Sequence, residues 1–222
     1  MSCNSNLMIE LVAFLGNPGL MYSRNRHNAG FLLAQKLPFA DSLSWQKKFK
    51  GLYAVLDRDR LAPAQESAAA ARVHFIKPET YMNRSGESVS ALAAFFKIKN
   101  DAILVIHDEL ELPLGTISLK YSGGLGGHNG LRSMKACFGT ADFWRIRIGI
   151  GRPDNRLPGE GGRAGSGEGI ADWVLSDFDA DEIEIFGRVM EIASELMLKV
   201  LTNDPKTLLP EWAKRRINND NN

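Results

Sequence analysis

The stretch AILVIHDE at residues 102–109 decides the class of fold. Its first five residues, Ala102–Ile106, form a continuous apolar run, which is typical of a central strand covered on both faces. The run ends abruptly at His107, Asp108 and Glu109. In open α/β sheets, ligand-binding groups gather just beyond the carboxyl ends of the strands. The stretch therefore predicts a buried strand with functional side chains at its end.

Segments of alternating type surround this strand. Apolar or alternating patterns predict strands near residues 9–15, 52–56, 72–77, 116–120 and 144–150, and helical spacing predicts helices near 28–37, 85–97 and 127–138. The alternation predicts an α/β fold, with one sheet in a single domain that spans residues 1–222.

Two further helices are expected near the end of the chain. Asp179, with Glu182 three residues later, resembles a capping box and predicts a helix start. The helix that follows is expected to bury Ile183, Phe186, Met190, Ala193, Met197 and Val200. Asp204-Pro205 predicts the start of a final helix, because proline is tolerated in the first turn.

Three segments are expected to lack regular structure. Residues 61–71 are rich in alanine and loosely patterned, which favours a surface loop or an irregular hairpin. Residues 154–169 are rich in glycine, proline and charge, and predict a flexible loop. The polar tail at residues 214–222 is expected to fray.

Composition excludes several classes of protein. The 222 residues carry 27 Lys and Arg against 26 Asp and Glu, a net charge of +1, so any contact with nucleic acid must use local basic groups. The two cysteines, Cys3 and Cys137, do not suggest a disulfide framework. We see no signal peptide and no apolar run long enough to cross a membrane, and therefore expect a cytoplasmic protein.

His27, which precedes the first predicted helix, is the candidate general base. Imidazole takes up a proton near neutral pH, and it needs a carboxylate to fix its tautomer and to stabilise the imidazolium. Asp108, at the end of the central strand, is the best-placed carboxylate. A histidine at a helix start also commonly serves only to cap or to pack, so the position by itself does not establish a base.

Three asparagines occupy comparable places: Asn17 follows the first strand, and Asn83 and Asn129 stand at helix entries. An amide side chain donates and accepts hydrogen bonds, so it can position water, grip a peptide backbone or stabilise an oxyanion. Asparagine is also common in turns and caps, and taken one at a time each position favours that simpler interpretation.

Other chemistries have weaker support. The sequence lacks the Cys and His pairs of a zinc site, so we expect neither a metal nor another cofactor. The Gly-rich segment 123–130 lacks the Gly-Lys-Ser/Thr ending of a P-loop. Ser23 and Ser85 do not lie in a Gly-x-Ser-x-Gly elbow, which disfavours a serine hydrolase.

Five blocks, in order, resemble the bacterial-type peptidyl-tRNA hydrolase family. They are GNPG (16–19) with Tyr22 and RHNAG (26–30); KPETYMNRSG (77–86); HDELELP (107–113); GGHNGL (126–131); and RIRIGIG (145–151). One such block would be a weak signal, whereas five in order are highly specific. The resemblance implies a monomeric α/β domain with a mixed twisted sheet, and hydrolysis of the ester that joins a peptide to the 3′ ribose of tRNA.

The resemblance also implies roles for single residues. His27 corresponds to the catalytic base and Asp108 to its orienting partner. Asn17 and Asn83 correspond to groups that hold the peptide and position the reacting groups, and Asn129 to one that positions water and the substrate carbonyl. The implied substrate-binding residues are Tyr22, Tyr81, Met82, Asn83, His128 and Asn129. Lys120 and Arg147 correspond to a clamp for the tRNA 5′-phosphate.

The chain departs from the family pattern at a few positions. Phe14 replaces a glycine, Asn25 stands where threonine is common, Glu111 stands where aspartate is common, and the loop at 154–169 is longer than expected. Two other functions stay open on sequence grounds: a tRNA-binding factor on the same scaffold without hydrolysis, and an unrelated small-molecule esterase or amidase. The set of His27, Asp108 and three asparagines disfavours the first, because binding does not need a general base.

Overall fold

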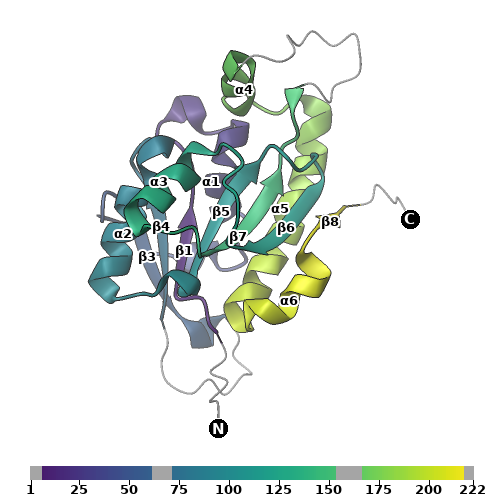
Figure 1. Cartoon of the computed structure of the whole chain (residues 1–222). Helices are drawn as coiled ribbons and strands as arrows, with labels where there is room; N and C mark the ends of the chain where they lie inside the picture. The colour runs from purple at the N-terminus through teal and green to yellow at the C-terminus, as the bar shows by residue number, and fades with distance from the viewer. Residues whose placement is uncertain (1–6, 62–71, 154–166, 218–222) are drawn as a thin grey trace.

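The computed structural model describes residues 7–61, 72–153 and 167–217. These residues form a mixed sheet with helices on both faces (Figure 1). The strands are β1 (Leu11–Phe14), β2 (Gln46–Lys48), β3 (Gly51–Asp57), β4 (Arg72–Pro78), β5 (Ile103–Glu109), β6 (Thr116–Tyr121), β7 (Trp144–Gly149) and β8 (Arg215–Arg216). The helices are α1 (Ala29–Ala34), α2 (Ser85–Phe96), α3 (Asn129–Phe138), α4 (Gly167–Val174), α5 (Ala180–Thr202) and α6 (Pro205–Trp212). The expected α/β class and mixed sheet are confirmed.

The strand order β2-β3-β4-β1-β5-β7-β6-β8 explains where a site can form. The four central strands β4, β1, β5 and β7 are parallel, whereas the pairings on either side of them are antiparallel. The carboxyl ends of parallel strands meet at one edge of the sheet. The segments that follow β1, β4 and β5 therefore converge there, although they are far apart in the sequence.

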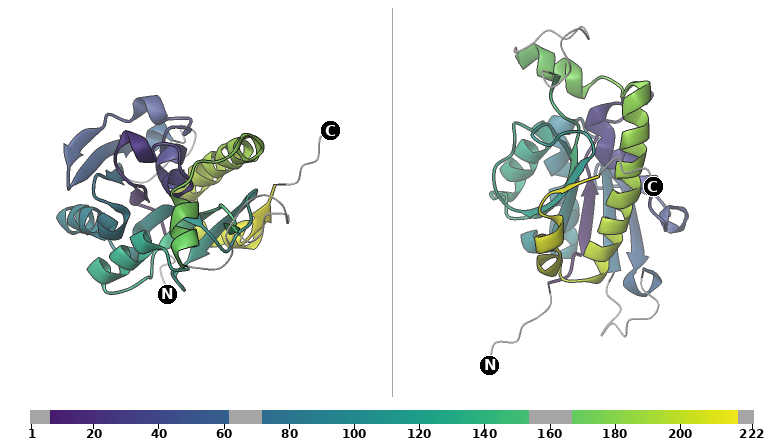
Figure 2. Two further views of the ribbon diagram at one scale, coloured as in Figure 1. Left: turned by 90° about the horizontal axis from the view of Figure 1, so that it is seen from above. Right: turned by 90° about the vertical axis from the view of Figure 1, so that its right-hand side faces the viewer.

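Alternation of side chains along β1 divides the core into two layers. Val12 and Phe14 pack with α1 and α5 on one face, and Leu11, Ala13 and Leu15 pack with α2 and α3 on the other. Figure 2 shows these two helical layers on opposite sides of the sheet. Burial on both faces accounts for the unbroken apolar sequence of the central strands.

The long helix α5 confirms the predicted capping box and corrects one predicted core residue. The Asp179 side chain accepts from Glu182 N at 2.9 Å, and the Glu182 side chain accepts from Asp179 N at 2.9 Å. Phe186, Met190, Ala193, Met197 and Val200 are buried as expected, but Ile183 is 51% exposed. Helix α1 covers α5 on this face, and its six residues span roughly 9 Å against roughly 35 Å for α5. Ile183 lies in the first turn of α5 and borders an open groove that Leu32 of α1 also lines, which leaves its side chain accessible to solvent.

Several predicted boundaries were wrong. The central strand continues through Glu109, because Asp108 and Glu109 still pair with β7, and the first helix is shorter than residues 28–37. Part of the tail expected to fray, Arg215–Arg216, pairs with β6 instead. The expected loops at 61–71 and 154–169 fall mostly outside the described residues, although residues 167–169 belong to α4. In the described ranges, none of the helices combines the length and apolarity needed to cross a membrane.

Candidate active site

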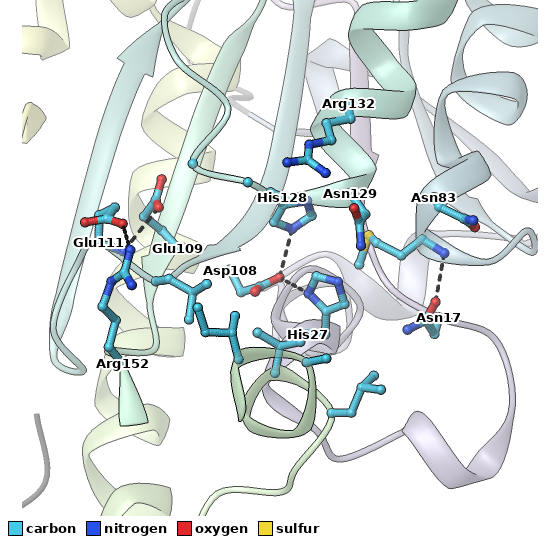
Figure 3. Close-up of a pocket in the computed structure, with 18 of the residues that line it drawn as sticks. Asn17, His27, Asn83, Asp108, Glu109, Glu111, His128, Asn129, Arg132 and Arg152 are labelled. Atoms are coloured by element: carbon cyan, nitrogen blue, oxygen red, sulfur yellow. Dashed lines mark hydrogen bonds and ion pairs between the residues drawn. The ribbon is translucent and has the colours of Figure 1, made fainter. Parts of the chain in front are cut away.

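A cavity of about 800 Å³ lies at the carboxyl edge of the sheet (Figure 3). Its lining comes from the segments after β1, β4 and β5, from the Gly-rich turn before α3, and from α4. The lining residues are Asn17, His27, Tyr81, Met82, Asn83, Asp108, Glu109, Leu110, Glu111, Gly126, Gly127, His128, Asn129, Arg132, Arg152, Ile170, Ala171, Val174 and Leu175. The volume is ample for a nucleoside or a short peptide segment.

His27 reaches this cavity because the chain enters α1 very close to the sheet. His27 lies in a 3₁₀ turn, Arg26–Asn28, directly before α1. A Cβ atom on Gly30 would lie 2.5 Å from the Leu15 carbonyl oxygen and 2.7 Å from that of Ile106. Glycine thus allows the helix to start against the ends of β1 and β5, which carries His27 to Asp108.

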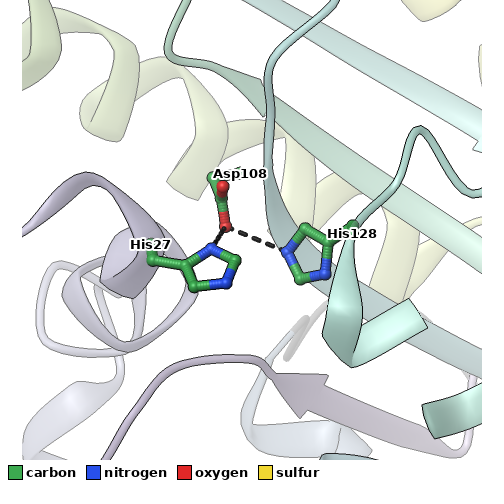
Figure 4. A group of neighbouring side chains, drawn as sticks. All are labelled: His27, Asp108 and His128. Atoms are coloured by element: carbon green, nitrogen blue, oxygen red, sulfur yellow. Dashed lines mark hydrogen bonds and ion pairs between the residues drawn. The ribbon is translucent and has the colours of Figure 1, made fainter. Parts of the chain in front are cut away.

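Asp108 accepts hydrogen bonds from two histidines at once (Figure 4). His27 Nδ1 lies 2.9 Å from Asp108 Oδ1, and His128 Nε2 lies 3.0 Å from the same oxygen. All three side chains are almost fully buried, and the two imidazole rings are 4.8 Å apart between centroids. Figure 4 shows one ring on either side of the carboxylate.

The hydrogen bonds fix which nitrogen of each ring carries the proton. His128 is the N-cap of α3, and its Nδ1 accepts from Gly130 N at 3.1 Å and Leu131 N at 3.3 Å. Its proton therefore sits on Nε2 and points at Asp108. A carboxylate can only accept, so His27 Nδ1 also donates to Asp108. The lone pair of His27 consequently lies on Nε2, the nitrogen that points away from Asp108.

Charge and burial oppose one another at the His27–Asp108 pair. Burial lowers the pKa of His27, but the charge of Asp108 and its hydrogen bond outweigh this, so the pKa is raised above the ordinary 6.5. Burial raises the pKa of Asp108, but the two histidines outweigh it and hold that pKa well below the usual range. Asp108 is thus a carboxylate at any working pH.

A third histidine, His107, contacts both His128 and the backbone of Asp108. His107 is fully buried and packs edge-on against His128, with centroids 4.9 Å apart. Its Nδ1 donates to the Asp108 backbone carbonyl at 2.6 Å. Burial and the neighbouring His128 keep the pKa of His107 well below its ordinary value, so this ring stays neutral.

The three asparagines meet at the cavity, as the strand-end argument predicts. Asn17 Oδ1 accepts from Met82 N at 2.8 Å, which leaves its amide nitrogen as the end that can donate to a ligand. Asn28 holds the Asn17 backbone through a pair of hydrogen bonds, of 2.7 and 3.0 Å. Asn83 and Asn129 are exposed at the rim, on the entries to α2 and α3 (Figure 3).

The same histidines and carboxylate form a group whose ligand atoms lie within 4.8 Å of one another, the spacing of a metal site. Their hydrogen bonds disfavour that use. A metal on His128 Nε2 would move the proton to Nδ1, where two backbone N–H groups already point.

The same hydrogen bonds disfavour phosphate binding at the start of α3. Two of the backbone N–H groups there already donate to His128 Nδ1, so fewer remain for a phosphate than a Gly-rich helix entry would ordinarily offer.

The remaining predicted residues divide into two sets. Tyr81 is exposed on the cavity rim and Met82 is buried in its wall, whereas Tyr22 does not line the cavity. Lys120 and Arg147 lie outside the cavity on neighbouring strands β6 and β7. Arg147 is not a free cation: it donates to Ser118 Oγ at 2.9 Å and to Glu109 Oε2 at 3.4 Å.

Sequence reasoning missed the wall formed by α4. Ile170, Ala171, Val174 and Leu175 from this segment line the cavity. These four apolar residues stand at positions i, i+1, i+4 and i+5, which is the spacing of one face of a helix. This periodicity is the feature of the sequence from which the helix could have been predicted. The helix was not predicted because its first residues, 167–169, fall within the segment expected to be a flexible loop.

Comparisons with known proteins agree on one family. The sequence model of the peptidyl-tRNA hydrolase family matches residues 11–220. The chain is 43% identical, over 94% of its length and 96% of the other protein, to a peptidyl-tRNA hydrolase from Treponema pallidum (strain Nichols). Solved structures of peptidyl-tRNA hydrolase from Acinetobacter baumannii are also similar. A point mutant has a TM-score of 0.76 at 31% identity, covering 94% of this chain and 96% of that one. A second structure has a TM-score of 0.70 at 32% identity, covering 92% and 96%.

Proposed function

The chain belongs to the peptidyl-tRNA hydrolase family and is a hydrolase that acts on ester bonds, and we propose that His27 is the general base of its reaction. The substrate is a peptidyl-tRNA, or an aminoacyl-tRNA with a blocked amino group. Hydrolysis of the ester at the 3′ ribose releases the peptide and returns the tRNA for reuse.

The His27–Asp108 hydrogen bond is the observation that carries this mechanism. With its proton on Nδ1 held by Asp108, His27 presents the Nε2 lone pair to a water in the cavity. As that water attacks the ester carbonyl, Nε2 takes its proton and Asp108 stabilises the imidazolium. The imidazolium then protonates the departing 3′ oxygen. The reaction balances with one water and no covalent intermediate on the enzyme.

The asparagines would supply the polar groups that the tetrahedral intermediate needs. The Asn17 amide nitrogen faces away from its Met82 contact and can donate to the peptide or to the developing oxyanion. Asn83 and Asn129 are free to adjust at the rim and would hold the peptide backbone and the attacking water. A well-placed oxyanion donor contributes about 3–4 kcal/mol to transition-state stabilisation.

Residues around the base would position the substrate. Tyr81 offers an exposed ring beside Asn83, and Met82 gives an adaptable apolar wall. The main role of His128 would be to donate a hydrogen bond to Asp108 rather than to contact the substrate. Tyr22 stands outside the cavity, and a role for it would require a peptide that extends beyond the rim.

Lys120 and Arg147 would hold the tRNA 5′-phosphate. They lie on one face of adjacent strands, where Lys120 is directly opposite Arg145 and Arg147 is directly opposite Ser118. Burial and the charges of Arg147 and Arg145 lower the pKa of Lys120, so the cations repel one another. A bound phosphate would relieve that repulsion, which supports the clamp.

The mechanism uses neither a metal nor another cofactor. His27 needs its Nε2 lone pair for water, and the tautomer of His128 is set by the helix that it caps. The monomeric state and the cytoplasmic location expected from the sequence stay predictions.

The test compares wild type with His27→Ala on N-acetyl-aminoacyl-tRNA and on free aminoacyl-tRNA, with EDTA present. We expect wild type to cleave the blocked substrate and His27→Ala to lose at least roughly 100-fold in turnover. His74→Ala is the matched control, because His74 is also a buried histidine but does not line the cavity. It lies on β4 and is hydrogen-bonded to Tyr53 on β3. Near-normal turnover of folded His27→Ala would remove the base assignment.

A further inference from the structure

A cluster of charge lies beside the cavity on one face of β5, β6 and β7. It comprises three cations, Lys120, Arg145 and Arg147, and the acid Glu109. Residues directly opposite one another in antiparallel strands share a face, which places Lys120 with Arg145 and Ser118 with Arg147. Burial and the neighbouring arginines lower the pKa of Lys120 and of Arg145, and the negative charge of Glu109 opposes this lowering at both groups.

The cations in this cluster have different tasks. Arg145 is buried and donates to the backbone carbonyls of Ser122, Gly123 and Gly124, so it ties down the Gly-rich turn. Arg147 is less enclosed, with 16% of its side chain exposed. Lys120 and Arg147 are therefore the cations that can receive a phosphate.

Glu109 is held in place between this clamp and the cavity. One carboxylate oxygen pairs with Arg147 Nη1 at 3.4 Å, and the other accepts from Glu111 N at 3.3 Å. The side chain is nearly buried, and a Cβ on Gly126 would lie only 3.0 Å from its Oε1. Figure 3 shows Glu109 at one end of the cavity, beyond Asp108 from Asn17 and Asn83. Its negative charge is thus a fixed feature of the clamp.

We infer that Glu109 limits the affinity of the Lys120–Arg147 clamp for phosphate, and so speeds release of the deacylated tRNA. The inference rests on the proposed 5′-phosphate clamp. Substrate and product carry the same tRNA, so contacts to the tRNA body hold both equally and do not accelerate the chemical step. A clamp made of cations alone would retain the product, whereas a fixed carboxylate beside Arg147 repels the phosphate and weakens both complexes.

The experiment measures Glu109→Gln, in which the amide can still accept from Arg147 but carries no charge. Binding of deacylated tRNA with a 5′-phosphate is followed at constant pH in low salt. We expect the affinity to rise roughly three- to tenfold, with the gain shrinking at high salt. KM should fall by a similar factor, and deacylated tRNA should be released more slowly than from the wild type.

Two controls test whether the effect of Glu109 is specific to phosphate binding at the clamp. Glu184→Gln makes the same change of net charge at an exposed site on α5, and should leave the affinity within about twofold. With 5′-hydroxyl tRNA, Glu109→Gln should give no more than about half of its gain, because the carboxylate then has no terminal phosphate to repel. Glu109→Met, which removes the charge with a different side chain, is measured in parallel in case the amide perturbs folding.

The outcomes separate this inference from the clamp itself. Unchanged affinity in both Glu109 variants, or a single-turnover rate that falls with the affinity unchanged, overturns the role of Glu109. A full gain with 5′-hydroxyl tRNA does so as well. If wild type binds 5′-hydroxyl tRNA as tightly as 5′-phosphorylated tRNA, the clamp is absent and both ideas fail. A normal 5′-phosphate preference together with unchanged Glu109→Gln binding refutes only the inference.

Discussion

At the scale of single residues, one carboxylate oxygen organises the protons of the cavity. Asp108 Oδ1 accepts from His27 Nδ1 and from His128 Nε2, and each ring is thereby restricted to one tautomer. His128 is restricted a second time by the two N–H groups at the start of α3. Both nitrogens of His128 are thus engaged in hydrogen bonds. Of the two histidines, His27 is therefore the one that can take up a proton from water.

Asp108→Asn should change both the rate and the pH at which the enzyme works. The base acts when His27 is neutral, so activity rises as pH passes through its pKa. In wild type that pKa is raised above 6.5, and the rising limb of kcat/KM should lie above this value. Without the carboxylate charge, burial alone acts on His27 and lowers its pKa, so the rising limb should move below 6.5.

The plateau rate of Asp108→Asn should also fall, by roughly 10²- to 10⁴-fold, because the amide can hold the wrong tautomer. The measurement is kcat/KM against pH for the two proteins, with Asp57→Asn at an exposed ion pair as the control. An Asp108→Asn profile that keeps the wild-type midpoint would contradict the pairing as the source of the shift.

The identity of the polar groups at the site followed from sequence, but their connections did not. Asp108 and Asn17 were expected at strand ends, and both lie there. His27 and Asp108 are 81 residues apart, and their contact depends on the close approach of α1 at Gly30. The second partner of Asp108, His128, could not be inferred, because its orientation is set by helix capping rather than by spacing.

At the scale of elements, the start of α1 is fastened to the segment that joins α4 to α5. Arg26 is buried, stacks 3.8 Å from the Trp173 ring, and donates to Ser176 Oγ, the Asp177 carbonyl and Glu182. Arg26 N also donates to the Ser176 carbonyl at 3.0 Å. The residue before the base is thus attached to the helix that forms one wall of the cavity.

Arg26→Lys should weaken this attachment, because an ammonium group cannot reproduce the planar, stacked fork of a guanidinium. We expect the free energy of unfolding to fall by about 2–4 kcal/mol, as is typical when a buried ion pair is impaired. Turnover should fall as well, since His27 and α4 lose their common support. Denaturant titration and steady-state kinetics at one pH provide the two readouts.

Arg188→Lys is the matched control for this prediction. Arg188 forms an exposed pair with Glu184 four residues earlier on α5, and such pairs contribute at most about 0.5 kcal/mol. If Arg26→Lys were no more costly than this surface change, the fastening of α1 to α4 and α5 would have little energetic weight.

The elements that sequence predicted well are those with long, regular patterns. The apolar central strands and the capping box of α5 are both as expected. The short edge strands β2 and β8 have two or three exposed residues, and their sequences carry no apolar alternation to reveal them. Ile183 continues the apolar stripe of α5, but it borders an open groove between α1 and α5 and is 51% exposed. Burial there depends on how closely α1 packs against α5, which the periodicity of one helix does not report.

At the scale of the whole molecule, a protein of net charge +1 must bind a polyanion through local groups. The proposed clamp provides such a group on β6 and β7, beside the cavity. Strand β6 is separated from β5 by β7, a sideways displacement of roughly 10 Å from Asp108. Ester hydrolysis and tRNA recognition would therefore use different parts of one sheet edge, and changes to one should leave the other measurable.

Lys120→Ala and Arg147→Ala should consequently raise KM while leaving the single-turnover rate at saturating substrate nearly unchanged. The loss should be several-fold larger with 5′-phosphorylated tRNA than with 5′-hydroxyl tRNA, because the terminal phosphate carries close to two charges at pH 7. Arg147→Ala should have the larger effect, since its loss also leaves the Glu109 carboxylate without its partner cation beside the phosphate. Lys99→Ala, at an exposed position before β5, controls for the general loss of a positive charge. Equal losses with both tRNAs would show that these residues bind the RNA backbone elsewhere, or only support the fold, and that the 5′ end is recognised by other groups.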